Sequence, residues 1–137
     1  MMVLDASAAI NAASSEIIEN ANEELIDFLD TEKFIAPRFF GIEAANSAWK
    51  FTHAGLYPES ETARMMATAV GHIDEFFDDE ELVGEAFSEA VRLDHPVYDM
   101  LYFVLARRKG VKLATADKEL ARLCEENGVE CVRVLDL

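Results

Sequence analysis

The chain has 137 residues, 51% of them hydrophobic, and a formal net charge of −15 from 27 acidic and 12 basic residues. This length and composition predict a single globular domain over residues 1–137 with a substantial core. No apolar run approaches a membrane span, and no basic segment precedes an apolar one at the N-terminus, so we expect a cytoplasmic protein. The net charge argues against a broad nucleic-acid-binding surface, although net charge does not exclude a local basic rim.

The N-terminal segment predicts a short buried strand that stops at a carboxylate. The apolar run Met2-Val3-Leu4 ends at Asp5, and the small residues 6–9 let a helix begin close to the strand end. In open α/β sheets ligands bind at the carboxyl edge of the strands, which would give Asp5 a functional role. Asp is also a common helix cap, so both interpretations of Asp5 stay open.

Alternation of helices and strands continues through the middle of the chain. Apolar spacing predicts a helix over residues 15–29 and a strand over 34–36. Pro37 is expected to open a helix that runs to about His53. On that helix one polar stripe carries Glu43, Asn46, Ser47 and Lys50, and the alternative interpretation of this stripe is a solvated face. A helix over 60–74 and a weakly indicated strand over 75–77 follow.

The C-terminal part contains the most informative stretch. The acidic run 78–81 predicts the start of a helix that ends before Pro96. From Pro96 to Lys109 the sequence is nearly all apolar except Asp99 and the basic end, so this helix should be mostly buried, with Gly110 closing it. A buried strand over 111–115, a helix to about Asn127 and a strand over 129–135 complete the chain. The two cysteines, Cys124 and Cys131, are too few for a zinc site, and we expect both to be reduced.

This order of elements predicts a three-layer α/β/α fold with a central, mostly parallel sheet of four or five strands. Asp5, Asp117 and the start of the Asp99 helix would then meet at one sheet edge, and Glu43 could reach that edge from the side. Four carboxylates this close would raise one another's pKa values. A divalent cation would resolve the repulsion, and oxygen ligands without His or Cys favour Mg²⁺ or Mn²⁺. Such an ion could polarise a phosphodiester and lower the pKa of a bound water.

Three segments resemble the PIN domain family, most closely its VapC-like toxin branch, and together they cover the chain. They are VLDASAAI, the proline-led helix with Glu43 and Asn46, and VYDMLYFVLARRKGVKLATADKEL. The resemblance implies an α/β/α sandwich of strand order 3-2-1-4-5 and a Mg²⁺-dependent endoribonuclease. It places the acids at Asp5, Glu43, Asp99 and Asp117, with Ser7, Thr115 and Asn46 supporting them. It also implies a homodimer and a cognate antitoxin that covers the site.

Some features leave alternatives open. Arg38, Lys50, Lys112 and Lys118 are the bases nearest the motif acids in sequence and could form a phosphate-binding rim for RNA, or be ordinary solvated surface. The three histidines, His53, His72 and His95, have no spacing that suggests catalysis. One rival function is a phosphatase or receiver-like domain with Asp5 as nucleophile, which would want a second Asp at position 7, where Ser7 stands. The other is a catalytically silent PIN-fold binding module, which the loss of an acid would have favoured.

The helices over 37–53 and 60–74 carry more large apolar residues than two surface helices need. These are Phe39, Phe40, Trp49, Phe51, Met65 and Met66. Because they cannot all face one small core, we expect some of them to form an exposed patch for a second copy or an antitoxin. An inhibitor that enters the acid site should carry an Arg to pair with the carboxylates.

Overall fold

The computed structural model describes residues 1–14 and 23–134, and its centre is a five-stranded parallel sheet of order β3-β2-β1-β4-β5. All four neighbouring strand pairs run parallel. The predicted fold class and strand order are therefore confirmed. The strands are β1 (Met2–Leu4), β2 (Phe34–Pro37), β3 (Ile73–Phe77), β4 (Lys112–Thr115) and β5 (Cys131–Arg133).

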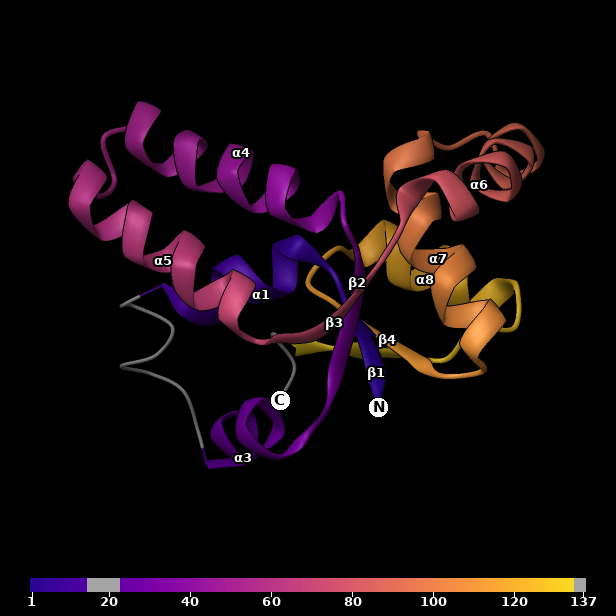
Figure 1. The fold of residues 1–137 in the computed structure, drawn as a ribbon, viewed down its shortest axis with the longest axis horizontal. Helices are drawn as coiled ribbons and strands as arrows, with labels where there is room; N and C mark the ends of the chain where they lie inside the picture. Colours follow the sequence, from indigo (N-terminus) through magenta and orange to yellow (C-terminus); the bar gives the residue numbers. More distant parts are fainter. Residues whose placement is uncertain (15–22, 135–137) are drawn as a thin grey trace.

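Helices cover both faces of this sheet (Figure 1). They are α1 (Ala6–Ala13), α3 (Glu23–Thr31), α4 (Phe40–His53), α5 (Glu59–Gly71), α6 (Asp79–Leu93), α7 (Val97–Lys109) and α8 (Lys118–Glu126). In Figure 1, α4 and α5 extend as a pair on one side of the sheet, while α6, α7 and α8 lie on the other. This division follows from right-handed crossovers, because the chain moves one way from β1 to β3 and the opposite way from β3 to β5. Among the described residues, no helix has the length and apolar content needed to cross a bilayer.

Several boundaries differ from the sequence-based expectations. Residues 15–22 of the helix expected over 15–29 lie outside the described residues, and α3 begins at Glu23. The weakly indicated third strand is present, and β3 begins earlier, at Ile73. The expectation that Pro37 opens a helix is wrong. Pro37 is the last residue of β2, in register with Phe77, and the next backbone N–H, of Arg38, donates to the Phe77 carbonyl at 2.9 Å, which keeps the chain extended there.

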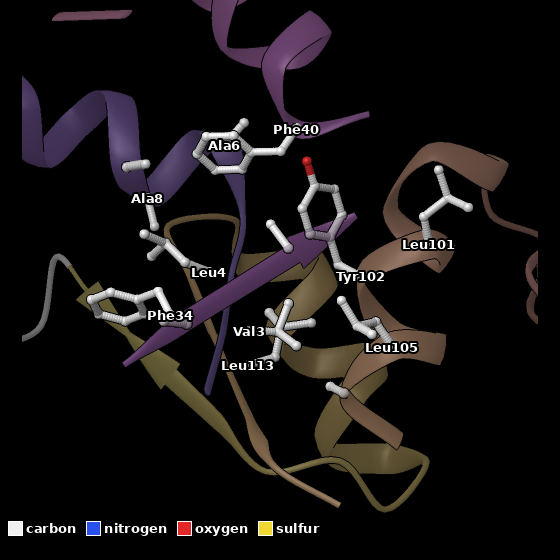
Figure 2. Close-up of a cluster of buried hydrophobic side chains, with 14 of the residues drawn as sticks. Val3, Leu4, Ala6, Ala8, Phe34, Phe40, Leu101, Tyr102, Leu105 and Leu113 are labelled. Atoms are coloured by element: carbon white, nitrogen blue, oxygen red, sulfur yellow. The ribbon is translucent and has the colours of Figure 1, made fainter. Parts of the chain in front are cut away.

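Helix α7 is the centre of the core, as its apolar sequence predicted. Its seven consecutive residues Met100–Ala106 are all buried, and the helix packs against β1, β2 and β4. In Figure 2, Leu105 of α7 lies beside Val3 and Leu113 of the sheet, and Tyr102 extends from α7 toward Phe40. At the end of α7, Gly110 adopts φ +64°, a left-handed conformation that closes the helix and directs the chain into β4.

The exposed apolar surface matches the sequence-based expectation only in part. Of the six expected residues, Phe40 and Met65 are core, Phe39, Phe51 and Met66 are half-buried against it, and only Trp49 is exposed. The reason is that α4 and α5 pack on each other and on α1, which buries their facing sides. Besides Trp49, the large exposed apolar side chains include Ile42, which is also on α4. Val83, Phe87 and Val91 on α6 are exposed too, and these were not expected. Both cysteines are free thiols, as expected.

Candidate active site

Asp5 is held at the end of β1 by a network that joins two strands. It caps α1 by accepting a 2.8 Å hydrogen bond from the backbone N–H of Ala8. The Ser7 hydroxyl donates to Asp5 Oδ1 at 2.8 Å, and the Thr115 hydroxyl donates to Asp5 Oδ2. Thr115 in turn accepts from the backbone N–H of Asp117 at 3.0 Å. Ser7, in the first turn of α1, and Thr115, at the end of β4, therefore fix the Asp5 carboxylate, and the same side chain both caps α1 and lies at the strand edge.

Burial makes Asp5 an unusual carboxylate. Only 4% of its surface is exposed. The pKa of Asp5 is raised to about 6, chiefly by desolvation and to a smaller degree by the charge of Asp99. The hydrogen bonds from Thr115, Ala8 and Ser7 act in the opposite direction and lower it. The hydrogen bonds favour the ionised form but do not offset the loss of water. Asp5 would thus be stabilised as an anion by any cation that reached it.

Glu43 lies in the first turn of α4 and faces the same edge. Desolvation raises the pKa of Glu43 to about 7, and the charges of Asp99 and Asp5 add to that effect, while Tyr102 and Lys50 oppose it. Glu43 Oε1 is buried and has no hydrogen-bond partner among the described residues. A buried carboxylate oxygen without a donor is costly, so this atom indicates a missing ligand or a role in chemistry.

Asp99, in the first turn of α7, is the third carboxylate at this edge. Its charge contributes to the raised pKa values of both Asp5 and Glu43, which places the three acids in one electrostatic cluster. His95 Nε2 lies 2.7 Å from Asp99 Oδ2, across the turn that precedes the helix. The imidazole is the more buried partner, with side-chain exposures of 10% for His95 and 29% for Asp99. His95 therefore fixes one oxygen of Asp99 and leaves the other free.

Asp117 occupies the same edge but a different environment. It is exposed and caps α8, accepting from the backbone N–H groups of Glu119 at 2.8 Å and Leu120 at 3.2 Å. It follows β4 directly, and its backbone N–H is tied to Thr115, so it is linked to Asp5 through one hydroxyl. The structure thus brings Asp5, Glu43 and Asp99 into one cluster and sets Asp117 beside it.

The donor set at this edge fits a hard divalent cation in charge and ligand type. Carboxylate oxygens are the ligands that Mg²⁺ and Mn²⁺ prefer, and the free acceptor at Glu43 Oε1 is a position such an ion or its water could occupy. As they stand, no three His, Cys, Asp or Glu side chains in the described part of the chain are arranged to hold a metal. The carboxylates repel one another, and Asp5, Asp99 and Asp117 are each turned to their own local donors.

The four bases proposed for an RNA-binding rim do not cluster. Lys112 begins β4 in register with Met2, so it lies at the opposite edge of the sheet, where its ammonium faces Glu130 at 3.7 Å. The sequence missed this because Lys112 is near the motif in sequence but at the other end of its strand. Arg38 lies at the end of β2 and pairs with Asp78 at 2.6 Å. Lys50 and Lys118 are exposed on α4 and at the start of α8, and Asn46 is exposed one turn after Glu43.

Sequence reasoning overlooked two residues of this site. His95 was treated as structural or solvated, yet it contacts Asp99, and its i, i+4 spacing from that acid was the available signal. Tyr102 appeared only as part of a motif, yet its hydroxyl is buried and lacks a hydrogen-bond partner among the described residues. Its position three residues after Asp99, on the same side of α7, would have placed it under the acids.

Comparisons with known proteins agree with this fold. No family model matches the sequence. Over 85 residues the chain is 35% identical to Ribonuclease VapC3 of Pyrobaculum aerophilum, a match that covers 58% of this chain and 62% of that protein. The match thus spans less than two thirds of the relative. The crystal structure of PAE2754 from Pyrobaculum aerophilum has the same fold, with a TM-score of 0.73 and 24% identity over 98% of this chain and 85% of that one.

Proposed function

We propose that this protein is a metal-dependent endoribonuclease of the VapC type, with a PIN-like fold, and the toxin of a type II toxin–antitoxin pair in the cytoplasm. The observation that carries the proposal is the cluster of Asp5, Glu43 and Asp99: burial raises the pKa values of Asp5 and Glu43, the charge of Asp99 adds to both shifts, and Glu43 Oε1 has no well-aligned hydrogen-bond partner in the described structure. The similarity to Ribonuclease VapC3 supports RNA as the substrate.

In this proposal each acid has a distinct task. Asp5, Asp99 and Asp117 would hold Mg²⁺, or Mn²⁺, directly or through water. Ser7, Thr115 and His95 would fix the orientation of Asp5 and Asp99, since their side chains contact those carboxylates. Glu43 would complete the shell or orient the attacking water for in-line displacement at phosphorus, and Asn46 would support it. When bound, the ion supplies Lewis-acid stabilisation of charge on the phosphate oxygens.

The surroundings of Asp5 argue against the phosphatase or receiver-like alternative. A carboxylate nucleophile must present an oxygen to a bulky phosphoryl group, whereas Asp5 is 4% exposed and both of its oxygens accept hydrogen bonds from within the protein; a small ion or its water needs only the lone pair that Oδ2 keeps after accepting from Thr115. A catalytically silent module would retain the fold but not need the costly grouping of ionisable acids. That alternative becomes an outcome of the experiment below.

The deciding experiment is RNA cleavage by the purified protein in Mg²⁺, Mn²⁺, Ca²⁺ and EDTA. We expect cleavage with Mg²⁺ or Mn²⁺, none in EDTA and little with Ca²⁺, because its larger and looser shell positions water and phosphate less well. Asp99→Asn should be inactive, whereas Asp30→Asn should match the original protein, because Asp30 is exposed on α3, next to the opposite edge of the sheet. Cleavage that persists in EDTA, or an Asp99→Asn variant that cleaves RNA as fast as the original protein, would contradict the proposal. If no RNA is cleaved under any condition, the catalytically silent binding module is favoured.

The partners belong to the same proposal. The net charge of −15 disfavours long RNA contacts, so substrate binding should depend on the few cations near the edge, Arg38, Lys50 and Lys118. Exposed Ile42 and Trp49 on α4, and the stripe of Val83, Phe87 and Val91 on α6, are candidate surfaces for a homodimer and an antitoxin. A clean monomer in sedimentation at micromolar concentration would defeat the homodimer. Co-expression with a neighbouring small gene should yield a complex that no longer cleaves RNA.

A further inference from the structure

Two buried polar atoms at the site lack hydrogen-bond partners among the described residues, and their chemistry is complementary. One is the acceptor Glu43 Oε1 and the other is the hydroxyl of Tyr102, which can donate. Tyr102 is fully buried and is one of the largest side chains of the core. Buried polar groups are nearly always satisfied, so a donor and an acceptor left without partners at one site call for a common explanation.

Tyr102 is a poor choice for a residue that only fills the core. In Figure 2 its ring lies among apolar side chains, and the hydroxyl points away from the sheet toward Phe40, the first residue of α4. A Phe would fill the same space without a polar atom to desolvate. Glu43 follows Phe40 by three residues on α4, and Asp99 precedes Tyr102 by three on α7; the charges of both acids, and of Asp5, raise the pKa of Tyr102, so its hydroxyl lies near all three.

The other acids already have donors of their own. Both oxygens of Asp5 are occupied, by Ser7 and Ala8 at one and Thr115 at the other. Asp99 is fixed by His95, and Asp117 by the backbone N–H groups of α8. Glu43 has the longest side chain of the four and no such donor in the described residues. The Tyr102 hydroxyl lies close enough to Glu43 for hydrogen bonding to lower the pKa of that carboxyl, although the two groups are not aligned as a regular hydrogen bond; burial first, and then the charge of Glu43, raise the pKa of Tyr102.

We propose that Tyr102 is a positioning residue of this site: its hydroxyl, which has no well-aligned partner among the described residues, would donate to the Glu43 carboxylate once an ion is bound and fix its orientation toward the ion and the attacking water. The inference rests on the proposed function. It adds a fourth donor to the set formed by Ser7, Thr115 and His95. It also explains why a polar side chain occupies the centre of an otherwise apolar helix.

The test removes a single oxygen atom with Tyr102→Phe. The matched control is Tyr98→Phe, which removes the same atom from an exposed tyrosine of the same helix, stacked on Phe39. For Tyr102→Phe we expect a metal-free Tm that is unchanged or higher, because a buried hydroxyl without a partner is lost. We expect kcat for RNA to fall about 10- to 100-fold with KM unchanged. The rise in Tm on adding Mn²⁺ should shrink, as it should in Glu43→Gln, while Tyr98→Phe should match the original protein in all three measurements.

A double variant shows whether Tyr102 acts through Glu43. Adding Tyr102→Phe to Glu43→Gln should cause no further loss of kcat or of the Mn²⁺-induced Tm rise, because residues that act as a unit are not additive. Additive losses, an unchanged kcat and Mn²⁺ response in Tyr102→Phe, or a clear fall in its metal-free Tm would each overturn the inference. If the original protein cleaves no RNA, the proposed function fails, but the Mn²⁺-induced Tm rise still tests Tyr102 by itself.

Discussion

Two regions of this protein gather carboxylates on helices and place them in opposite electrostatic environments. Where α6 packs on α7, Glu85 accepts from Arg107 at 2.6 Å and from Arg108 at 2.7 Å, and Glu89 accepts from Arg107 at 3.2 Å. The Arg107 hydrogen bond holds the pKa of Glu85 below its ordinary value, against partial desolvation, and Arg108 adds to that effect. At the strand edge, burial raises the pKa of Asp5 to about 6 and of Glu43 to about 7.

The difference is that Glu85 and Glu89 form ion pairs with arginines, whereas Asp5, Glu43 and Asp99 have no arginine partner among the described residues. Arg107 and Arg108 end α7, the helix that carries Asp99 at its start, so one helix serves both regions. Cations near the end of a helix and an acid near its start both suit the helix dipole. In the described part of the chain, no Arg or Lys forms an ion pair with Asp5, Glu43 or Asp99, and Lys50 only partly offsets the raised pKa of Glu43.

The largest effect should come from neutralising single acids in each region. Asp5→Asn, Glu43→Gln, Asp99→Asn and Asp117→Asn should each lower kcat for RNA cleavage by about 10³-fold, equivalent to about 4 kcal/mol of transition-state stabilisation. Glu85→Gln should leave kcat unchanged, because Glu85 lies in the arginine-paired region. Steady-state cleavage assays with circular dichroism as the folding control decide this. An active Asp5→Asn or Asp99→Asn would refute the site assignment.

The two regions should also differ in their effect on stability with pH. Asp5 and Glu43 have folded pKa values above their ordinary ones, so the folded state binds more protons than the unfolded state between about pH 4 and 7, and stability falls as pH rises through that window. For Asp5, a shift from 3.8 to about 6 corresponds to roughly 3 kcal/mol. In EDTA, the Tm should be higher at pH 5.5 than at pH 8.

Removing a carboxyl group is the control for this pH effect. Asp5→Asn and Glu43→Gln should each flatten the Tm profile, and the metal-free Tm of these variants at pH 8 should equal or exceed that of the original protein. The lowered pKa of Glu85 acts only at more acidic pH, so it does not contribute within this range. A Tm that rises steadily from pH 5.5 to pH 8 in EDTA would contradict the raised pKa values.

A smaller effect is expected from breaking the paired region itself. Arg107→Gln removes ion pairs to Glu85 and Glu89 and the contact of the guanidinium with the Phe103 ring, 4.9 Å away. It should lower the free energy of unfolding by about 1 kcal/mol, since the pairs are partly exposed, and leave kcat unchanged. Arg122→Gln, in the exposed pairs of α8, should change the Tm less. Urea unfolding of the two variants measures both free energies of unfolding. Equal losses of free energy in Arg107→Gln and Arg122→Gln would mean that the α6–α7 ion pairs contribute no more than exposed ones.

The smallest expected effect is on RNA affinity, and it concerns the lysine side chains that could contact RNA. Lys118 follows Asp117 at the site edge, whereas Lys112 lies at the opposite edge beside Glu130. Lys118→Gln should weaken RNA binding a few-fold and reduce the salt dependence of log K by about 0.7, the value for one contact to a single strand. Lys112→Gln should change neither quantity. Fluorescence anisotropy at several salt concentrations, in EDTA to prevent cleavage, separates them, and a larger effect of Lys112 would mean that RNA binds elsewhere.

Much of the fold could be predicted from the sequence because the patterns that indicate its helices and strands are local. The buried α7, its closing Gly110, the acidic start of α6 and the strand that stops at Asp5 all follow from apolar spacing, capping residues and helix dipoles within short windows. The error at Pro37 has the opposite cause. A proline that could open a helix was kept extended by pairing with β3, about 40 residues further along the chain.

The sequence by itself determined the order of elements and a mostly parallel sheet between helices, and it singled out four acids as candidates for one edge of that sheet. Only the tertiary structure decided which donors each acid meets, because those partners come from distant segments: Thr115 is 110 residues from Asp5, and Arg107 is 22 residues from Glu85. It also decided that Lys112 lies at the far edge and that the buried Tyr102 hydroxyl comes near enough to Glu43 for each to shift the pKa of the other. Periodicity along a chain reports local conformation and burial, whereas the energy of a charge depends on distances and desolvation that exist only in the packed molecule.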